Sequence, residues 1–178
     1  MSTIARSRYS ITVRLAHWLT VLAIAAAYLL VELGEDDERG GTPALAMQGH
    51  YLAGLAVLAL LVVRVVGMAR GHRPPIVPAP GRLTVLAAGI THAALYLFLL
   101  GEPILGILSV NYAGEAVTLP WSGVALPMLV HADPAAREVV EELHELLGEI
   151  FYWVIGLHVA AALWHHVVKR DNTLRRML

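Results

Sequence analysis

The chain has 178 residues, of which 57% are hydrophobic and 15% are charged, and its net charge is −1. Its mean hydropathy of +0.63 exceeds that of a soluble domain, in which about 45–50% of residues are apolar. The absence of cysteine excludes disulfides, thiolate metal sites, iron–sulfur ligation and covalent haem attachment through C-x-x-C-H. The charge balance gives no indication of nucleic-acid binding, and nine histidines is a large number for so apolar a chain.

Four apolar segments are long enough to cross a bilayer, because about 30 Å of hydrocarbon takes roughly 20 helical residues. The helices are expected at about residues 12–33, 43–68, 83–112 and 134–169. We therefore predict an all-α membrane protein in which residues 1–178 form a single domain, a four-helix transmembrane bundle embedded in the lipid bilayer.

Local signals refine the last two helices. Asp133 and Pro134 supply an N-cap and a proline at the first helical position. One helix from Pro134 to Lys169 would measure about 54 Å at about 1.5 Å per residue, and would extend beyond the membrane. Pro103, inside the third segment, is expected to kink or end that helix.

The distribution of positive charge predicts the orientation. Eleven of the 13 lysines and arginines lie near the start of the first helix, around the connection between the second and third, or at and beyond the end of the fourth. Only Arg39 and Arg137 lie on the opposite side, together with the acidic stretch 35–38. By the positive-inside rule, both termini are predicted to be cytoplasmic in a bacterial inner membrane.

Most of the histidines lie at or within membrane depth, where ionisable side chains are costly and usually mark function. They are His17, His50, His92, His144, His158, His165 and His166. His144 and His158 are close to four helical turns apart, so both imidazoles leave the same face of one helix, about 21 Å apart. That spacing suits two haems, one in each leaflet.

Each of these haems needs a second axial ligand from another helix. Matching depths pair His50 with His144 on the outer side and His17 with His158 on the inner side, and His92 is an alternative inner ligand. One intramembrane histidine is often only a structural hydrogen-bonding group, but four at matching ends of three helices favour ligation. Two imidazoles on one iron leave no open position for oxygen, so such a haem carries single electrons.

Other polar and aromatic residues in the membrane have simpler interpretations. Arg64 is expected to extend its charge to the interface or to pair with a haem propionate. Tryptophans and tyrosines are expected to pack or to form interfacial belts, and these are Trp18, Tyr28, Trp121, Trp153 and Trp164.

Several stretches resemble the bacterial cytochrome b561 family, and in particular its superoxide oxidase (superoxide:ubiquinone oxidoreductase) branch. The resemblance covers essentially the whole chain. The matching stretches are His17-Trp-Leu19, Tyr28–Gly34, Pro74-Pro-Ile-Val-Pro78, Tyr96 with Pro103 and Gly106, Leu143-His-Glu145, Gly156–His166 and Asp171–Met177. The last two are the most specific.

The resemblance implies two non-covalent bis-histidine haems b, with axial pairs His17/His158 and His50/His144. It also implies an oxidoreductase that carries electrons from a periplasmic one-electron donor, with superoxide as the expected donor, to ubiquinone. A quinone site near the inner end of the fourth helix would involve His165. Because quinone reduction consumes protons, His165 is also a candidate proton donor.

Two other functions fit the same sequence. Related four-helix di-haem proteins relay electrons from a partner hydrogenase or dehydrogenase to quinone, and the 114–133 connection would then be a docking surface for a periplasmic redox partner. The second is a haem-free transporter or metal-binding membrane protein. The outer segments are acidic, whereas capture of superoxide, an anion, favours positive charge.

Overall fold

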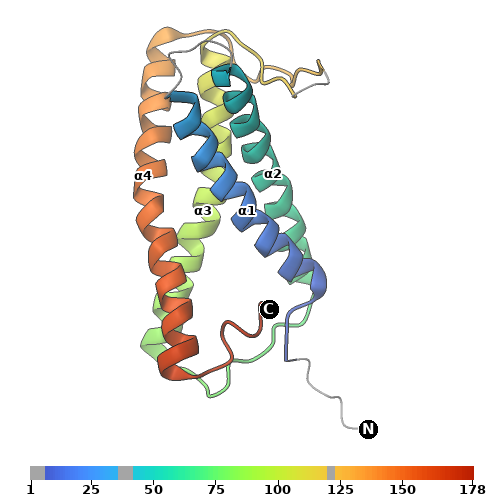
Figure 1. The fold of residues 1–178 in the computed structure, drawn as a ribbon, viewed down its shortest axis with the longest axis vertical. Helices are drawn as coiled ribbons and strands as arrows, with labels where there is room; N and C mark the ends of the chain where they lie inside the picture. The colour runs from blue at the N-terminus through green and yellow to red at the C-terminus, as the bar shows by residue number, and fades with distance from the viewer. Residues whose placement is uncertain (1–6, 36–41, 120–122) are drawn as a thin grey trace.

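The computed structural model describes residues 7–35, 42–119 and 123–178 (Figure 1). It contains α1 (Ile11–Glu35), α2 (Thr42–Arg70), α3 (Arg82–Tyr112) and α4 (Pro134–Trp164), and a π-helical turn, η1 (His165–Lys169), continues α4. Some residues discussed above lie outside the described ranges, namely residues 36–38 of the acidic stretch, Arg39 and Trp121.

All four helices are long and apolar enough to cross a membrane. Their outward faces carry large apolar side chains that touch little of the protein. Leu83 and Trp153 are each 83% exposed, and Leu97 is 72% exposed. Such a surface would be unstable in water and suits hydrocarbon, since a soluble protein rarely exposes large contiguous apolar patches.

The capping signals of the sequence act where they were expected. The Asp133 carboxylate accepts hydrogen bonds from the backbone N–H groups of Ala135 and Ala136, at 3.0 and 3.1 Å, and Pro134 occupies the first turn of α4. In α3, by contrast, the helix continues through Pro103 to Tyr112, so the proline does not end it.

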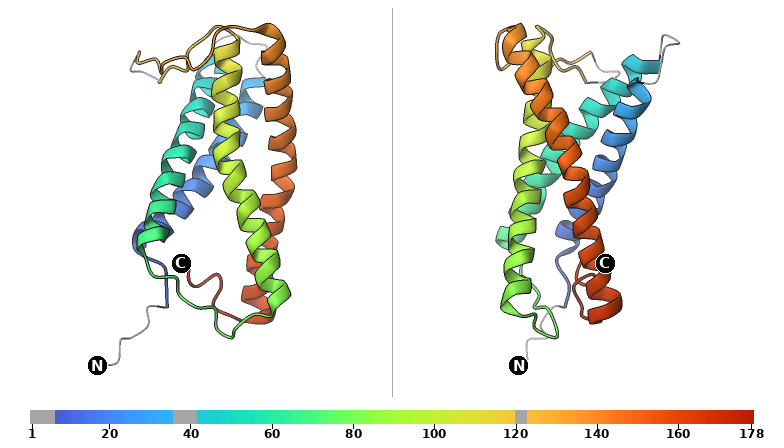
Figure 2. Two further views of the ribbon diagram at one scale, coloured as in Figure 1. Left: turned by 180° about the vertical axis from the view of Figure 1, so that it is seen from behind. Right: turned by 90° about the vertical axis from the view of Figure 1, so that its left-hand side faces the viewer.

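The bundle consists of two helix pairs, with α1 packed along α2 and α3 packed along α4, and with α2 also touching α3 (Figure 2). In the described part of the chain, no Cα atom of α4 comes within 8 Å of one in α1 or α2. This wide separation leaves room for side chains and cavities between α4 and the first helix pair.

The start of α1, the C-terminus and the α2–α3 connection lie at one end of the bundle, and the α3–α4 connection lies at the other (Figure 1). The segment 170–178 folds back beneath the bundle, where Trp18 Nε1 donates to the Met177 carbonyl oxygen at 2.8 Å. The Val77 N–H donates to Asn172 Oδ1, also at 2.8 Å. This segment therefore ties α1 to the α2–α3 connection.

Candidate functional site

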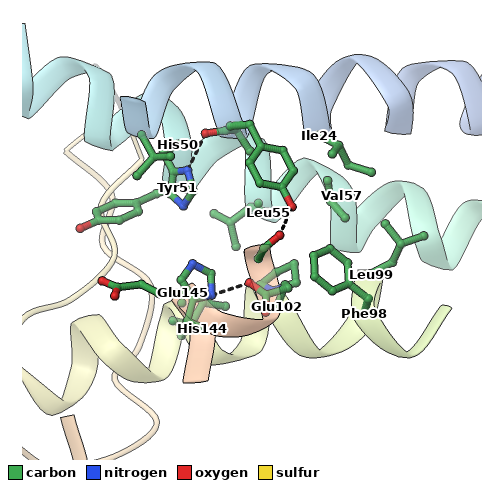
Figure 3. A pocket seen from close by; sticks show the side chains of 18 of the residues that line it. Ile24, His50, Tyr51, Leu55, Val57, Phe98, Leu99, Glu102, His144 and Glu145 are labelled. Carbon is green, nitrogen blue, oxygen red and sulfur yellow. Dashed lines mark hydrogen bonds and ion pairs between the residues drawn. The ribbon is translucent and has the colours of Figure 1, made fainter. Parts of the chain in front are cut away.

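Two cavities lie between α4 and the other helices. The one nearer the α3–α4 connection, which we call the outer cavity, has a volume of about 390 Å³ and contains His50 from α2 and His144 from α4 (Figure 3). Their ring centroids are 6.1 Å apart and the rings are nearly perpendicular, at 84°. His50 Nδ1–H donates to the Ala27 carbonyl oxygen at 2.9 Å, which leaves its Nε2 free to act as a metal ligand.

A carboxylate from α3 accompanies this pair. Glu102 is 8% exposed, and its Oε2 lies 2.7 Å from Nδ1 of His144 (Figure 3). The alignment of the two groups is poor for a hydrogen bond, and the other oxygen, Oε1, is buried without a partner. The carboxyl group of Glu102 thus lies beside Nδ1 of His144, on the side of the ring away from Nε2, the nitrogen that would bind a metal.

The other cavity, which we call the inner cavity, has a volume of about 700 Å³, lies nearer the start of α1 and the segment 170–178, and contains three histidines. His17 from α1 and His158 from α4 have ring centroids 6.5 Å apart at 79°, and His92 from α3 lies 5.5 Å from His158. The structure therefore brings together each of the sequence-predicted pairs and also places the alternative ligand, His92, within the same cavity.

The distance between helices distinguishes the two candidate pairs of the inner cavity, His17/His158 and His92/His158. His92 and His158 lie on α3 and α4, which pack closely against each other. His17 and His158, like His50 and His144, lie on helices whose backbones stay more than 8 Å apart. A flat macrocycle inserted between two axial imidazoles needs such a wide gap, so helix spacing favours His17.

The ring separations suit a shared metal ion. A metal–imidazole bond is about 2 Å long and the ring nitrogen is about 1.1 Å from the centroid, so two axial imidazoles stand about 6 Å apart. Gly106 lies next to the His144 ring, since a Cβ built at Gly106 would be 3.4 Å from Cε1 of that ring. The absence of a side chain at Gly106 therefore leaves space beside the imidazole. Both cavity volumes fall within the range of about 300–1,000 Å³ typical of cofactor sites. The residues present therefore fit two bis-histidine haems.

A guanidinium group accompanies the inner histidines. Arg64 from α2 lines the inner cavity, and its Cζ lies 5.4 Å from the centre of the Tyr96 ring. Its Nε is buried and has no hydrogen-bond partner. Arg64 thus faces the cavity, which agrees with a propionate partner better than with a side chain extended to the interface.

Two tyrosines separate the cavities. Tyr28 and Tyr152 line both of them, and their ring centroids are 4.7 Å apart in an edge-to-face arrangement. Tyr28 donates to the Gly148 carbonyl oxygen at 2.7 Å, which links α1 to α4 across the wide gap. Leu99 also lines both cavities and packs with Val57 in the small apolar core.

His165 has a partner of its own at the end of α4. Its Nδ1 donates to the carboxylate of Asp171, which is only 5% exposed. Burial acts to raise the pKa of Asp171, but hydrogen bonds from His165 and from the Thr173 N–H outweigh it and lower that pKa. His165 is not among the residues that line the inner cavity, although Leu174 and Leu178 of the folded-back segment are.

Sequence reasoning missed Glu102 and the separating role of Tyr28 and Tyr152. One signal for Glu102 was available, because a carboxylate inside an otherwise apolar span is costly and commonly has a functional reason. No pattern in the sequence indicated which helix face would carry it.

The fold and the two half-buried histidine pairs are those expected of multi-pass membrane haem proteins. A family model described as "Prokaryotic cytochrome b561" matches residues 8–178. The chain belongs to this family, which binds haem b and transfers electrons.

Individual relatives agree with the family. The chain is 34% identical to "Cytochrome b561 homolog 1" of Escherichia coli (strain K12) over 175 residues, covering 97% of each protein. It is 36% identical to "Probable superoxide oxidase CybB" of Yersinia pestis over 165 residues, covering 91% of this chain and 90% of the relative. "Cytochrome b561 homolog 2" of Escherichia coli is 28% identical over 183 residues. These findings support an oxidoreductase role in general.

Proposed function

We propose that this chain is a transmembrane di-haem oxidoreductase that carries electrons from superoxide on the periplasmic side to ubiquinone in the membrane. His50 and His144 hold the outer haem b, and His17 and His158 hold the inner one. When bound, each haem supplies reversible one-electron chemistry at iron. The chain fixes the imidazoles, excludes water with apolar walls and sets the distance between the two centres.

The observation that carries the proposal is the pairing of histidines at two depths along a single helix. His144 and His158 leave one face of α4, and each meets an imidazole about 6 Å away that comes from the α1–α2 pair. A pathway for metal ions, or a structural hydrogen-bond network, would not require the same separation between imidazole rings at both depths of the bundle. Neither would require a wide gap between helices at both depths.

The proposed reaction balances as follows. Two superoxide ions each lose one electron and become molecular oxygen, and one ubiquinone takes both electrons and two protons and becomes ubiquinol. The relative named as a probable superoxide oxidase supports superoxide as the donor. The orientation that places His50 and His144 toward the periplasm rests on the positive-inside rule, with both termini in the cytoplasm of a bacterial inner membrane.

On the acceptor side, His165 is the proposed proton donor at a quinone site near the inner end of α4. The Asp171 carboxylate accepts its Nδ1 proton and so leaves Nε2 to face a substrate. We place ubiquinone between this end of α4 and the inner cavity. A His165→Ala variant should keep its haems and their reduction by superoxide, and lose roughly 100-fold or more in ubiquinol formation, the usual range for loss of a proton-transferring group.

The test uses purified protein in liposomes that contain ubiquinone. Superoxide is generated outside, and haem reduction and ubiquinol formation are followed together in wild type and in the His165→Ala variant. Ubiquinol that accumulates at two superoxide ions per quinone supports the proposal. Haems that stay oxidised under superoxide, yet are reduced by a purified periplasmic dehydrogenase or hydrogenase, would show that the chain is a partner subunit instead.

The charge of the outer cavity predicts an unusual salt dependence. Four carboxylates line it, and among its described lining residues there is no lysine or arginine; they are Glu32, Glu102, Glu145 and Glu149. Because superoxide is repelled by them, added salt screens the repulsion, and haem reduction should become faster between low and physiological ionic strength. Stopped-flow absorbance measures this rate. A rate that falls as salt is added would reveal an attractive entry path and contradict this prediction.

A further inference from the structure

The two cavities carry opposite kinds of buried charge beside their histidines. The outer cavity is lined by carboxylates alone among its charged residues, and Glu102 is the one in contact with a histidine. The inner cavity is lined by the guanidinium of Arg64, with Glu32 as its only described carboxylate. Glu32 lines both cavities and is exposed, so the charged groups that distinguish the two histidine sites are Glu102 at the outer one and Arg64 at the inner one.

Glu102 is buried and Arg64 is half-buried, and neither forms an ion pair with a lysine, arginine or carboxylate side chain in the described part of the chain. Apart from His144, no basic side chain there comes within 4.0 Å of the Glu102 carboxylate, and Glu102 Oε1 is buried without a partner. No carboxylate there comes within 4.0 Å of Arg64, whose buried Nε also lacks a partner. Unpaired charged groups in an apolar interior are costly, and ionisable residues within membrane spans usually have a functional role.

These charges act on electron affinity in opposite directions. Reduction adds an electron to a metal centre, so a nearby negative charge disfavours it and a nearby positive charge favours it. A carboxylate behind an axial imidazole also raises the basicity of that ligand. Both effects are stronger in the interior than in water, because the effective dielectric is lower there.

We propose that Glu102 and Arg64 set the direction of electron flow, by holding the His50/His144 centre at a lower reduction potential than the His17/His158 centre. This inference rests on the proposed function, since it requires a haem on each histidine pair. Electrons then move spontaneously from the outer centre to the inner one. Glu102 and Arg64 are positioning residues, because they act on the haems through the ligand and through the field.

The test is a redox titration of the purified full chain, followed by optical absorbance, with haem content measured for every variant. Glu102→Gln keeps the shape and removes the charge, so the lower of the two potentials should rise while the upper one stays unchanged. Arg64→Gln should lower the upper potential alone. Arg64→Lys, which retains the charge, should restore it.

A surface carboxylate provides the matched control. Glu138 lies exposed on α4, two turns before His144, and does not line the outer cavity. Glu138→Gln removes the same charge from a site that water and salt screen, so both potentials should stay at their wild-type values.

The outcomes separate the inference from the proposed function. Two haems with unchanged potentials in Glu102→Gln, or a shift of the upper potential, would overturn the inference and leave the di-haem assignment intact. Loss of the outer haem in both Glu102→Gln and Glu102→Leu would also overturn it, because Glu102 would then hold the ligand in place. A wild-type protein without two haems would remove both proposals together.

Discussion

A His50→Ala variant is expected to purify with one haem b per chain in place of two. The outer cavity would then offer a single axial imidazole, His144, and no other histidine lines that cavity among the described residues. The remaining haem should stay bound to the inner pair and keep its absorbance bands. Haem extracted into alkaline pyridine and divided by protein concentration gives the ratio.

The control for this loss is a histidine outside the membrane. His131 lies exposed in the α3–α4 connection, so His131→Ala should retain both haems. If His50→Ala keeps two haems with unchanged spectra, the outer pair is assigned wrongly. If it loses both, the two sites fold as one unit, and His144→Ala should then reproduce the loss.

The second large effect concerns the inner cavity, where His17→Ala should lose the inner haem and His92→Ala should retain it. Both imidazoles lie near His158, with ring centroids at 6.5 Å for His17 and 5.5 Å for His92. The wide gap between α1 and α4 accommodates a macrocycle, whereas α3 and α4 are packed together. We therefore expect His17 to be the inner ligand, and His92 would lie to the side of a haem held by His17 and His158.

The two variants are compared by their haem content and by low-temperature electron paramagnetic resonance, which reports axial ligation. His92→Ala should show two bis-imidazole signals, and His17→Ala only one. The reverse result, with two signals in His17→Ala and one in His92→Ala, would identify His92 as the inner ligand and shift the inner haem toward the α3–α4 pair.

Much of this fold could be predicted because the bilayer imposes a simple rule on sequence. Length and hydropathy indicate four spans, and α4 begins at the proline after Asp133 because the capping chemistry is local. Pro103 was expected either to kink the third helix or to end it, and the predicted bounds of 83–112 agree with those of α3. A proline can end a helix, but α3 continues through it, since neighbouring helices support the backbone that the proline disrupts.

The histidine pairs could be predicted only in part. Depth along the helices pairs His144 with His50 and His158 with His17, because depth follows from residue number. The lateral position of His92 does not follow from depth, and the sequence left it as an alternative. Only the distances between helix backbones distinguish a helix that faces α4 across a gap from one that packs against it.

The contacts that Glu102 and Asp171 make with histidines could not be predicted from the sequence. The contact of Glu102 with His144 depends on the rotation of α3 about its axis and on the depth at which α3 meets α4. The pairing of His165 with Asp171 depends on the left-handed turn at Arg170, where φ is 53°. Neither arrangement has a periodic pattern, so each becomes visible only when the helices are placed in three dimensions.

The central claim is that the two histidine pairs hold two haems, and one measurement tests it most directly. The protein is purified in mild detergent, its dithionite-reduced minus oxidised spectrum is recorded, and haem is quantified per chain. We expect b-type bands and two haems for each polypeptide. A colourless protein, or a single haem in a fully folded preparation, would contradict it, and the colourless result would favour a haem-free transporter.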